Sequence, residues 1–400
     1  MTAHDSRTPT AASGIDLGTT HTVVARAGAA VQLSESGPQP TLLPSVVAFP
    51  PSGGDLVGWP AKARRTIDPR NTLMSTKRLI GASAHSARAK RFAERHPYDV
   101  VDASGTAAIR TRAGTVSPIA VAARILTHAV TSAGISPAGQ RAVVTVPAAF
   151  GVEERRATVE AARAAGFASA HLVDEPVATA IAYLSRSNLH YGVVYDLGGG
   201  TFDMAVVDCR KFPFEVVANG GDLYLGGDDV DRELALHVAD RVLMTTGWDL
   251  ASDAETFARL VANTEAAKRA LSDSDSAAID LLAADPAAPW KERLFELQQS
   301  ELRPIVDRMV RRTFVICDAV LGEARLTVKD IDAVFLAGGS TSLPGLREMV
   351  GEYFGKRARS DLDPMHVVAI GASLAAMRPQ LERLLSKYGT PHQGTPRPPL

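Results

Sequence analysis

Cysteine is scarce in this chain, which has two among 400 residues. Cys209 and Cys317 lack the spacing of metal ligands. Two cysteines also do not indicate the disulfide framework that stabilises small secreted proteins. The composition therefore favours a reducing compartment, and we expect a cytoplasmic protein.

An excess of charge of one sign is also absent. Lys and Arg number 43 and Asp and Glu number 44, which leaves a formal net charge of −1. This balance gives no global basic field for nucleic acid or a membrane surface. No apolar run is long enough to cross a bilayer, and residues 1–12 lack the apolar core of a signal peptide. We therefore expect neither a nucleic-acid nor a membrane partner.

The most informative stretch is residues 195–203, which reads Tyr-Asp-Leu-Gly-Gly-Gly-Thr-Phe-Asp. Apolar runs at 192–195 and 204–207 flank it, which predicts a strand, a glycine turn and a return strand. Three glycines remove side chains from the turn, so backbone N–H groups can approach an anion. The same stretch supplies two carboxylates and a hydroxyl: Asp196, Asp203 and Thr201. It suits a phosphate chain with a divalent cation, although a lone glycine hairpin is more often only a hairpin.

A second copy of this pattern stands near the start of the chain. Residues 14–20 read Gly-Ile-Asp-Leu-Gly-Thr-Thr, and an apolar return strand follows at 21–25. Asp16 matches Asp196, and Thr19 or Thr20 supplies a hydroxyl. A repeat this far apart predicts a duplicated domain. Two lobes could then face each other across a cleft, with both aspartates on one metal ion.

Strand and helix patterns alternate between the two copies. Strands are predicted at 142–146 and 171–174, and helices at 152–165 and 177–184, which is typical of an α/β layer. Glu175 follows a strand, where carboxylates point into the ligand cleft of such sheets. The alternative is a simple helix-start acid, favoured by the helix dipole.

The second half adds two further candidate features. One helix face carries Glu265, Lys268, Arg269 and Ser272 at i, i+3, i+4 and i+7. This face is either solvent-exposed, with a Glu–Arg pair, or a polar rail for a base and ribose. A strand at 331–337 leads into a third glycine turn, Gly338, Gly339 and Ser340, whose amides could hold a nucleotide. Residues 290–321 are predicted to be mostly helical, with a kink or break at Pro304.

Together these motifs resemble the ATPase domain of the heat shock protein 70 family, within the actin-like ATPase fold. The resemblance covers residues 14–377 and depends on the order of eight motifs. They lie at 14–20, 77–81, 144–148, 175–176, 196–203, 225–227, 265–272 and 338–341. The implied fold class is α/β, with two ribonuclease H-like lobes around a nucleotide cleft.

The resemblance implies a role for each matching residue. Phosphate contacts fall on Gly18, Thr19 and Thr20 of one lobe and on Gly198, Gly199 and Gly200 of the other. Asp16 and Asp196 match the carboxylates that hold hydrated magnesium. Groups near the γ-phosphate are Lys77, Thr201 and Asp203, and Glu175 orients the attacking water. Adenosine contacts are Glu265, Lys268, Arg269, Ser272, Gly338, Gly339 and Ser340. Relay between the lobes falls to Pro147 and Arg155.

Three departures from the family pattern limit what carries over. Ser342 stands where the family usually has an arginine that stacks on adenine, so adenine binding would weaken. Met365 and His366 replace acidic residues at the start of the last helix. The chain also ends in a Pro-rich stretch where family chaperones continue into a peptide-binding β-sandwich. We therefore expect no built-in peptide-binding domain.

The sequence thus predicts a slow ATPase that switches conformation for a protein partner or co-chaperone. Its ligands would be ATP or ADP with Mg²⁺, and K⁺ is a further candidate ion. We expect lobe I at 13–191 and lobe II at 192–378, with disordered ends at 1–12 and 379–400. Two alternatives stay open: a small-molecule kinase of the same fold, and a non-hydrolysing scaffold or filament protein.

Overall fold

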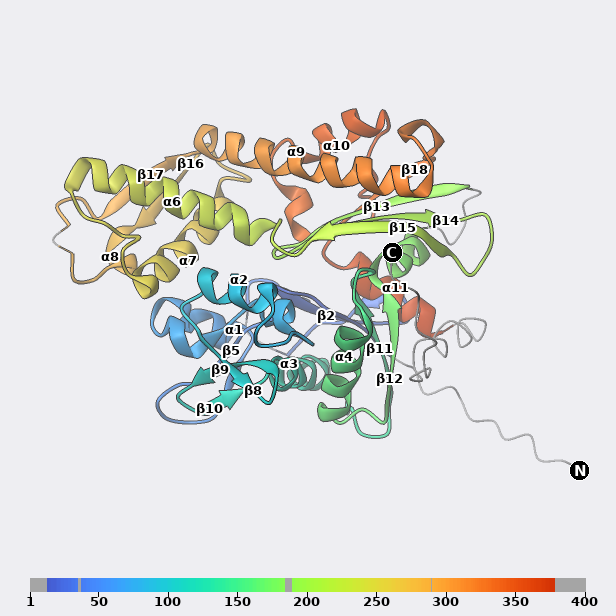
Figure 1. Cartoon of the computed structure of the whole chain (residues 1–400), viewed down its shortest axis with the longest axis horizontal. Coiled ribbons are helices and arrows are strands. Elements are labelled where there is room, and N and C mark those ends of the chain that lie inside the picture. The colour runs from blue at the N-terminus through green and yellow to red at the C-terminus, as the bar shows by residue number, and fades with distance from the viewer. Residues whose placement is uncertain (1–12, 35–36, 184–188, 289, 378–400) are drawn as a thin grey trace, which may run out of the picture.

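The computed structural model describes residues 13–34, 37–183, 189–288 and 290–377. The two ends predicted to be disordered, 1–12 and 379–400, lie outside the described residues. Two lobes, each with its own hydrophobic core, lie one above the other (Figure 1). The prediction of an α/β fold is confirmed. Among the described helices, none has both the length and the apolar character needed to cross a membrane.

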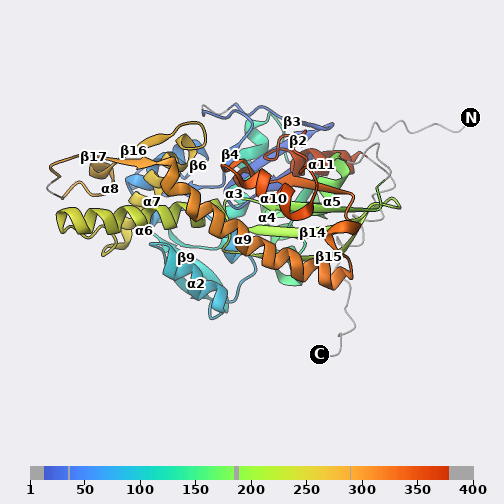
Figure 2. The same ribbon diagram turned by 90° about the horizontal axis from the view of Figure 1, so that it is seen from above.

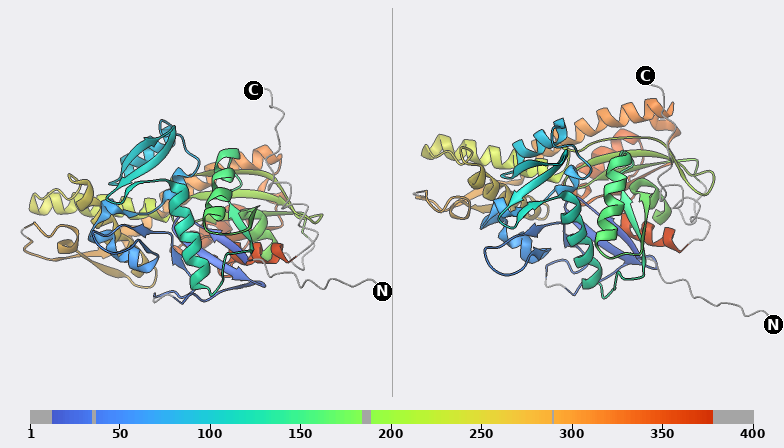
Figure 3. Two further views of the ribbon diagram at one scale, coloured as in Figure 1. Left: turned by 90° about the horizontal axis from the view of Figure 1, so that it is seen from below. Right: turned by 60° about the horizontal axis from the view of Figure 1, so that its bottom comes forward.

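The lobe I sheet has the strand order β12-β11-β1-β2-β3, with β4 also pairing with β2. Strands β1 and β2 form the predicted antiparallel hairpin, and β11 lies parallel beside β1. Helices α3 and α4 pack together and cover this sheet, as Figure 3 shows from below. The strands are β1 (Ser13–Leu17), β2 (His21–Arg26), β3 (Ala29–Ala30), β4 (Leu43–Pro44), β11 (Arg141–Val146) and β12 (Ser169–Asp174).

The lobe II sheet repeats this unit in the order β15-β14-β13-β18. Strands β13 and β14 form the second antiparallel hairpin, and β18 lies parallel beside β13, as β11 does beside β1. Helix α9 crosses this sheet (Figure 2). The strands are β13 (Tyr191–Leu197), β14 (Phe202–Asp208), β15 (Glu215–Asp222) and β18 (Ala333–Ala337).

The remaining elements surround these two sheets. The helices are α1 (Trp59–Lys62), α2 (Ala87–Arg95), α3 (Pro118–Ser132), α4 (Val152–Ala164), α5 (Glu175–Tyr183), α6 (Gly227–Thr246), α7 (Ala254–Ala270), α8 (Leu281–Ala284), α9 (Gln299–Ala324), α10 (Leu346–Phe354) and α11 (Val367–Ala376). Three small sheets contain β5 (Val47–Ala48), β6 (Leu56–Val57) and β7 (Thr72–Leu73); β8 (Asp99–Ala103), β9 (Thr106–Thr111) and β10 (Gly114–Val116); and β16 (Ser276–Asp280) and β17 (Leu294–Gln298).

Helices α5 and α11 join the lobes at their base. They cross so closely that a Cβ atom on Gly371 would lie 1.8 Å from the carbonyl oxygen of Ala178. Helix α11 also packs on the lobe I sheet, since a Cβ on Gly14 would lie 2.2 Å from the backbone nitrogen of Ser373. The small residues predicted to allow a close helix crossing therefore do so. Because side chains of both lobes share this core, the two cores are joined.

One prediction of local structure is wrong. Residues 290–298 do not begin a helix, because they contain β17, which pairs with β16. Helix α9 then begins after a capping box of Gln298 and Glu301 and runs past Pro304 without a break. The residues Val-Gln-Leu at 31–33 also favour a strand, but the structure places the neighbouring strand at Ala29–Ala30.

Candidate functional site

The two glycine bends meet directly. We call residues 18–20 the first bend and residues 198–200 the second bend; each follows the first strand of its hairpin. A Cβ atom added to Gly199 would lie 2.0 Å from the hydroxyl oxygen of Thr20, and one on Gly200 would lie 2.4 Å from Cγ2 of Thr19. The second bend therefore needs glycine because the threonines of the first bend occupy the space.

Surrounding loops hold the carbonyl groups of both bends. The hydroxyl of Ser45 donates to the Gly18 carbonyl at 2.8 Å, and the hydroxyl of Ser340 donates to the Gly198 carbonyl at 2.8 Å. The backbone N–H of Asp228 donates to the Gly199 carbonyl at 2.6 Å. In contrast, four amides of the bends donate to no acceptor in the described part of the chain: those of Thr19, Thr20, Gly199 and Gly200. These amides are free to bind an anion.

Four carboxylates gather beside the bends. Asp16 and Asp196 end equivalent strands, and Asp203 lies opposite Asp196 in the hairpin register. Burial, followed by repulsion from Glu175, raises the pKa of Asp16 to about 7. The same two causes raise the pKa of Asp203 to about 7 and the pKa of Asp196 well above its usual value. These raised pKa values show that nearby positive charges do not fully balance the negative charge of the four carboxylates.

Lys77 is a cation inside this group, and its ammonium lies 2.8 Å from Glu175 Oε1. Burial opposes the charge on Lys77, but attraction to Glu175 and Asp16 outweighs it and raises the lysine pKa. Arg78, the next residue, donates to the Gly200 carbonyl at 2.6 Å and is 3% exposed. Arg78 is therefore buried and Lys77 is mostly buried, although a Lys-Arg pair is usually solvated on the surface.

One cavity connects these groups and encloses about 80 Å³. Its lining contains both bends, Lys77, Glu175, Thr201 and the two strand-end aspartates, together with Gly338 and Gly339 of the third glycine turn. Met365 lies against Gly339, where an added Cβ would lie 3.2 Å from Cε of Met365. One departure from the family pattern therefore faces this central cavity, whereas Ser342 is exposed and outside its lining.

The residues predicted to relay nucleotide state, Pro147 and Arg155, lie near Asp174, the residue before Glu175. Arg155 donates to the Asp174 carboxylate at 2.7 Å and to the Phe150 carbonyl at 2.8 Å. The backbone N–H of Phe150 in turn donates to the Pro147 carbonyl at 3.0 Å. Arg155 thus ties the loop after β11 to the residue preceding Glu175.

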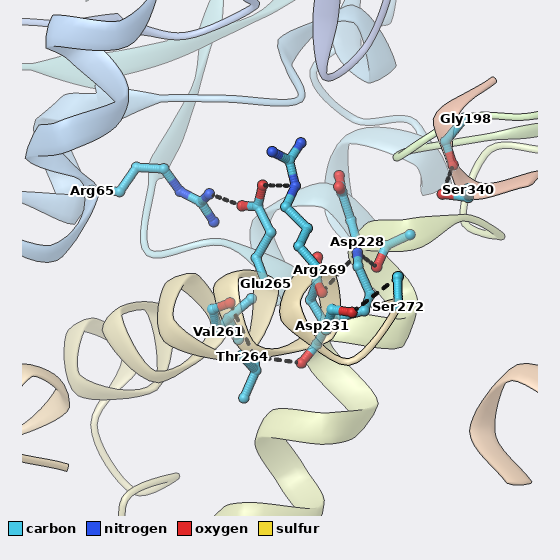
Figure 4. Close-up of polar contacts among 12 residues, drawn as sticks. Arg65, Gly198, Asp228, Asp231, Val261, Thr264, Glu265, Arg269, Ser272 and Ser340 are labelled. Carbon is cyan, nitrogen blue, oxygen red and sulfur yellow. Dashed lines mark hydrogen bonds and ion pairs between the residues drawn. The ribbon is translucent and has the colours of Figure 1, made fainter. Parts of the chain in front are cut away.

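The predicted adenosine rail lies outside the central cavity, on α7 and the turn that follows it (Figure 4). Glu265 is bound by Lys62 at 2.6 Å and by Arg65, both from lobe I. Lys268 lies 2.8 Å from Asp231 and donates to the Gly227 carbonyl. The other two rail residues stay close to their own helix: Arg269 lies 3.7 Å from Glu265, and the Ser272 hydroxyl bonds the Lys268 carbonyl. In this structure the rail therefore joins the two lobes through the ion pairs of Glu265 with Lys62 and Arg65.

Several residues of this region were missed by the sequence analysis. They are His21 and Val23 in the central cavity, and Lys62 and Arg65 across the lobes. Lys62 ends α1 and Arg65 lies in the helical turn that follows, but nothing in this basic segment indicates that it faces Glu265, about 200 residues away. His21 directly follows the first bend, and its place in the sequence could have indicated that it lies in the central cavity.

The donor set fits a hydrated magnesium ion. Among the described residues, no three His, Cys, Asp or Glu side chains converge closely enough to bind a metal directly. Magnesium dehydrates reluctantly and usually keeps several waters while it binds one or two carboxylates and substrate phosphates. Asp16 and Asp196, which are partly buried, line the cavity and are repelled by their neighbours, are the groups that could hold such an ion through its water shell.

Comparison with known proteins identifies the family. A family model described as Hsp70 protein matches residues 12–379. The Chaperone protein HscA homolog of Acidithiobacillus ferrooxidans is 39% identical over 381 residues, covering 94% of this chain and 59% of that protein. Chaperone protein HscA of Proteus mirabilis is 41% identical over 371 residues, covering 91% of this chain and 58% of its own length. The chain thus spans about three fifths of the length of these relatives, and it belongs to the Hsp70 family.

Proposed function

We propose that this chain binds Mg-ATP between its two lobes and hydrolyses it slowly to ADP and phosphate. The observation that carries the proposal is the direct meeting of the two bends, with free amides on both and buried carboxylates beside them. Anions bind where such amides converge, and a divalent cation would balance the surplus carboxylate charge. Membership of the Hsp70 family supports the same activity.

The residues of the cavity can divide the chemistry among them. The amides of both bends would bind phosphate oxygens. Lys77, whose raised pKa keeps it protonated at neutral pH, would balance charge that develops on the transferred phosphoryl group. Glu175 would orient the attacking water. The Thr201 hydroxyl would contact the transferred phosphoryl group. Bound magnesium would neutralise phosphate charge in the ground state and transition state.

The lobes must separate to admit a nucleotide. The central cavity encloses about 80 Å³, whereas ligand pockets usually measure about 300–1,000 Å³. Opening would break the ion pairs of Glu265 with Lys62 and Arg65, and it would free the rail to contact adenosine. Since both lobes then hold one ligand, bound ATP favours closure and hydrolysis relaxes it. A protein partner would read this switch.

Calorimetric titration with Mg-ATP and Mg-ADP, combined with a phosphate-release assay, tests the proposal. We expect saturable binding of both nucleotides and slow release of phosphate. Binding without phosphate release would favour the scaffold alternative, and phosphate release that requires an added sugar would favour the kinase. No binding of either nucleotide would contradict the proposal.

A further inference from the structure

A second and larger cavity lies between the lobes, outside the central one. It encloses about 280 Å³. Lobe I contributes Arg65, Arg78, Arg95, His96 and Tyr98, and lobe II contributes Asp228, Arg232 and Phe257. We call it the rear cavity. Because both lobes form its walls, its shape depends on how far the lobes close.

Three hydrogen-bond donors of the rear cavity lack acceptors among the described residues. The Nε atom of Arg78 and the Nε2 atom of His96 are both buried without a partner. Arg232, on α6, forms neither a hydrogen bond nor an ion pair in the described chain, and its guanidinium lies 4.8 Å from the centre of the Phe257 ring. A buried donor without an acceptor costs about 1–3 kcal/mol, so Arg78 and His96 indicate a missing acceptor, while the partly buried Arg232 adds an unpaired positive charge beside them.

The charges around the rear cavity also favour an anion. Four arginines and two acids, Glu94 and Asp228, line it. Arg65 and Arg95 are paired with Glu265 and Asp229, respectively, and Arg78 lies 3.7 Å from Asp228 and Asp229. Arg232 forms no ion pair within the described residues. Burial and repulsion from Arg95 lower the pKa of Arg232. Burial and the surrounding guanidinium groups likewise lower the pKa of His96 well below its usual value. A neutral imidazole can donate one N–H, while the guanidinium groups supply the charge.

From these contacts we infer that the rear cavity is a binding site for a phosphate-class oxyanion, held by Arg78, His96 and Arg232. Such an anion has oxygens in several directions and can accept from three donors at once, and arginine suits its geometry. Because the donors come from both lobes, the bound anion holds the lobes together.

The source of the anion can be free phosphate or the phosphate product of the central cavity. Arg78 separates the two cavities, since it donates to the Gly200 carbonyl of the second bend and also lines the rear cavity. Asp228 stands in the same wall, where its backbone N–H donates to the Gly199 carbonyl. Product phosphate would reach the rear cavity only if Arg78 moved away from the Gly200 carbonyl.

Calorimetric titration of the nucleotide-free chain with inorganic phosphate at constant ionic strength tests the site. Arg232→Met keeps the packing on Phe257 without the charge, and His96→Phe keeps the ring that stacks on Tyr98. Each should weaken phosphate binding roughly tenfold, because a hydrogen bond to a charged group contributes about 1.5–3 kcal/mol. Melting temperatures of the variants report whether they fold.

The matched control is Arg241→Met. Arg241 lies on the same helix and also stacks on a phenylalanine, 4.7 Å from the ring centre of Phe295, but outside the rear cavity. It should bind phosphate as the parent does. No phosphate binding by the parent, or equal affinity in all of these proteins, would overturn the inference. Loss of binding in Lys77→Ala alone would also overturn it, because the anion would then occupy the central cavity.

Single-turnover phosphate release identifies the source, and only this arm depends on the proposed ATPase function. The quantity to compare is the rate of phosphate release divided by the rate of ATP cleavage. If this ratio is higher in Arg232→Met than in the parent, product phosphate enters the rear cavity. Equal release, together with weakened calorimetric binding, means that the site takes phosphate from solution. If the parent cleaves no ATP, the proposed function fails while the calorimetric result still decides the site.

Discussion

The first and second bends end equivalent hairpins but differ where they touch. The first carries threonines, and the second carries glycines at the facing positions. Each threonine side chain fills the space that a Cβ on the second bend would need. The repeat therefore produced two complementary surfaces rather than two identical ones. A duplicated fold can close tightly on a ligand when its copies have diverged at the contact in this way.

The acids beside the bends differ as well. The Thr145 hydroxyl donates to Asp16 at 3.1 Å, which lowers its pKa and partly offsets burial and repulsion from Glu175. Asp196 instead faces three carboxylates, those of Glu175, Asp203 and Asp16, and Lys77 opposes them. In the absence of a cation, the negative charge of Asp196 in lobe II is therefore less favourable than that of Asp16 in lobe I. The four predictions below test these differences, beginning with the largest expected effect.

Lys77, from lobe I, should matter more for catalysis than Thr201, from lobe II. Lys77→Ala should slow single-turnover ATP cleavage by about 10²–10³-fold, as does removal of one donor that stabilises transition-state charge. Thr201→Ala removes a neutral hydroxyl and should slow cleavage by about tenfold. Calorimetry should show ATP binding largely intact in both. Lys90→Ala, on the exposed face of α2, is the control. Parent-like cleavage in Lys77→Ala would remove this residue from the catalytic group.

Gly199→Ala should separate the bends. The added Cβ would lie 2.0 Å from the Thr20 hydroxyl oxygen, and overpacking typically costs about 1–3 kcal/mol. We expect Mg-ADP affinity to fall roughly 10- to 100-fold. Gly54→Ala is the control, because nothing lies within 4 Å of its Cβ. The double variant Gly199→Ala with Thr20→Gly exchanges the small residue between the bends and should recover part of the affinity. No recovery would mean that the contact with Thr20 is not the cause.

Glu265→Gln should release nucleotide faster. It removes the charge that holds Lys62 and Arg65 across the lobes. We expect ADP dissociation to accelerate about three- to tenfold, because glutamine keeps a hydrogen bond to the buried Arg65 but loses the charge that strengthens it by on the order of 1 kcal/mol. Stopped-flow release of a fluorescent ADP measures this rate. Glu301→Gln, which breaks ion pairs within lobe II only, should leave the rate unchanged. The same acceleration in both variants would contradict a role for the contact between lobes.

The stability of the nucleotide-free protein should depend on the buried acids. The pKa of Asp16 is about 7 in the folded state and about 3.9 when unfolded. The folded state thus binds more protons between about pH 4 and pH 7, and this contribution to stability is lost as pH rises through 7. Asp16→Asn should raise stability at pH 8 by on the order of 1–4 kcal/mol. Asp196→Asn should raise it more.

Urea unfolding of the nucleotide-free protein at pH 5 and at pH 8 measures this effect. The difference between each variant and the parent should be clearly smaller at pH 5 than at pH 8, because the stability is lost progressively between about pH 4 and pH 7. A difference that is equal at both values would show that the carboxylates are ionised throughout this range.

The local parts of the site could be predicted from the sequence because glycine and alternating apolar residues act over a few positions. Both hairpins, the strand ends at Asp16 and Asp196, and the close crossing at Gly371 follow from such patterns. The small sheet β8–β10 was not predicted, because Ala, Asp and Thr in residues 99–116 give a weak strand signal.

Contacts between distant segments could not be predicted in the same way. Arg78 was as consistent with a solvated surface as with burial, because its partners, the Gly200 carbonyl and Asp228, lie in the other lobe. Likewise the helical spacing of Glu265 and Arg269 was read correctly, but the ion pair with Arg65 depends on how the lobes close. Spacing predicts which residues share a face, and the tertiary fold decides what that face meets.

A crystal structure of the chain with Mg²⁺ and a non-hydrolysable ATP analogue tests the central claim most directly. The account predicts that the phosphates lie between the two bends, bonded to amides of Thr19 and Gly199, with the hydrated ion beside Asp16 and Asp196. Phosphates bound elsewhere, or touching one bend while the other stays free, would contradict it.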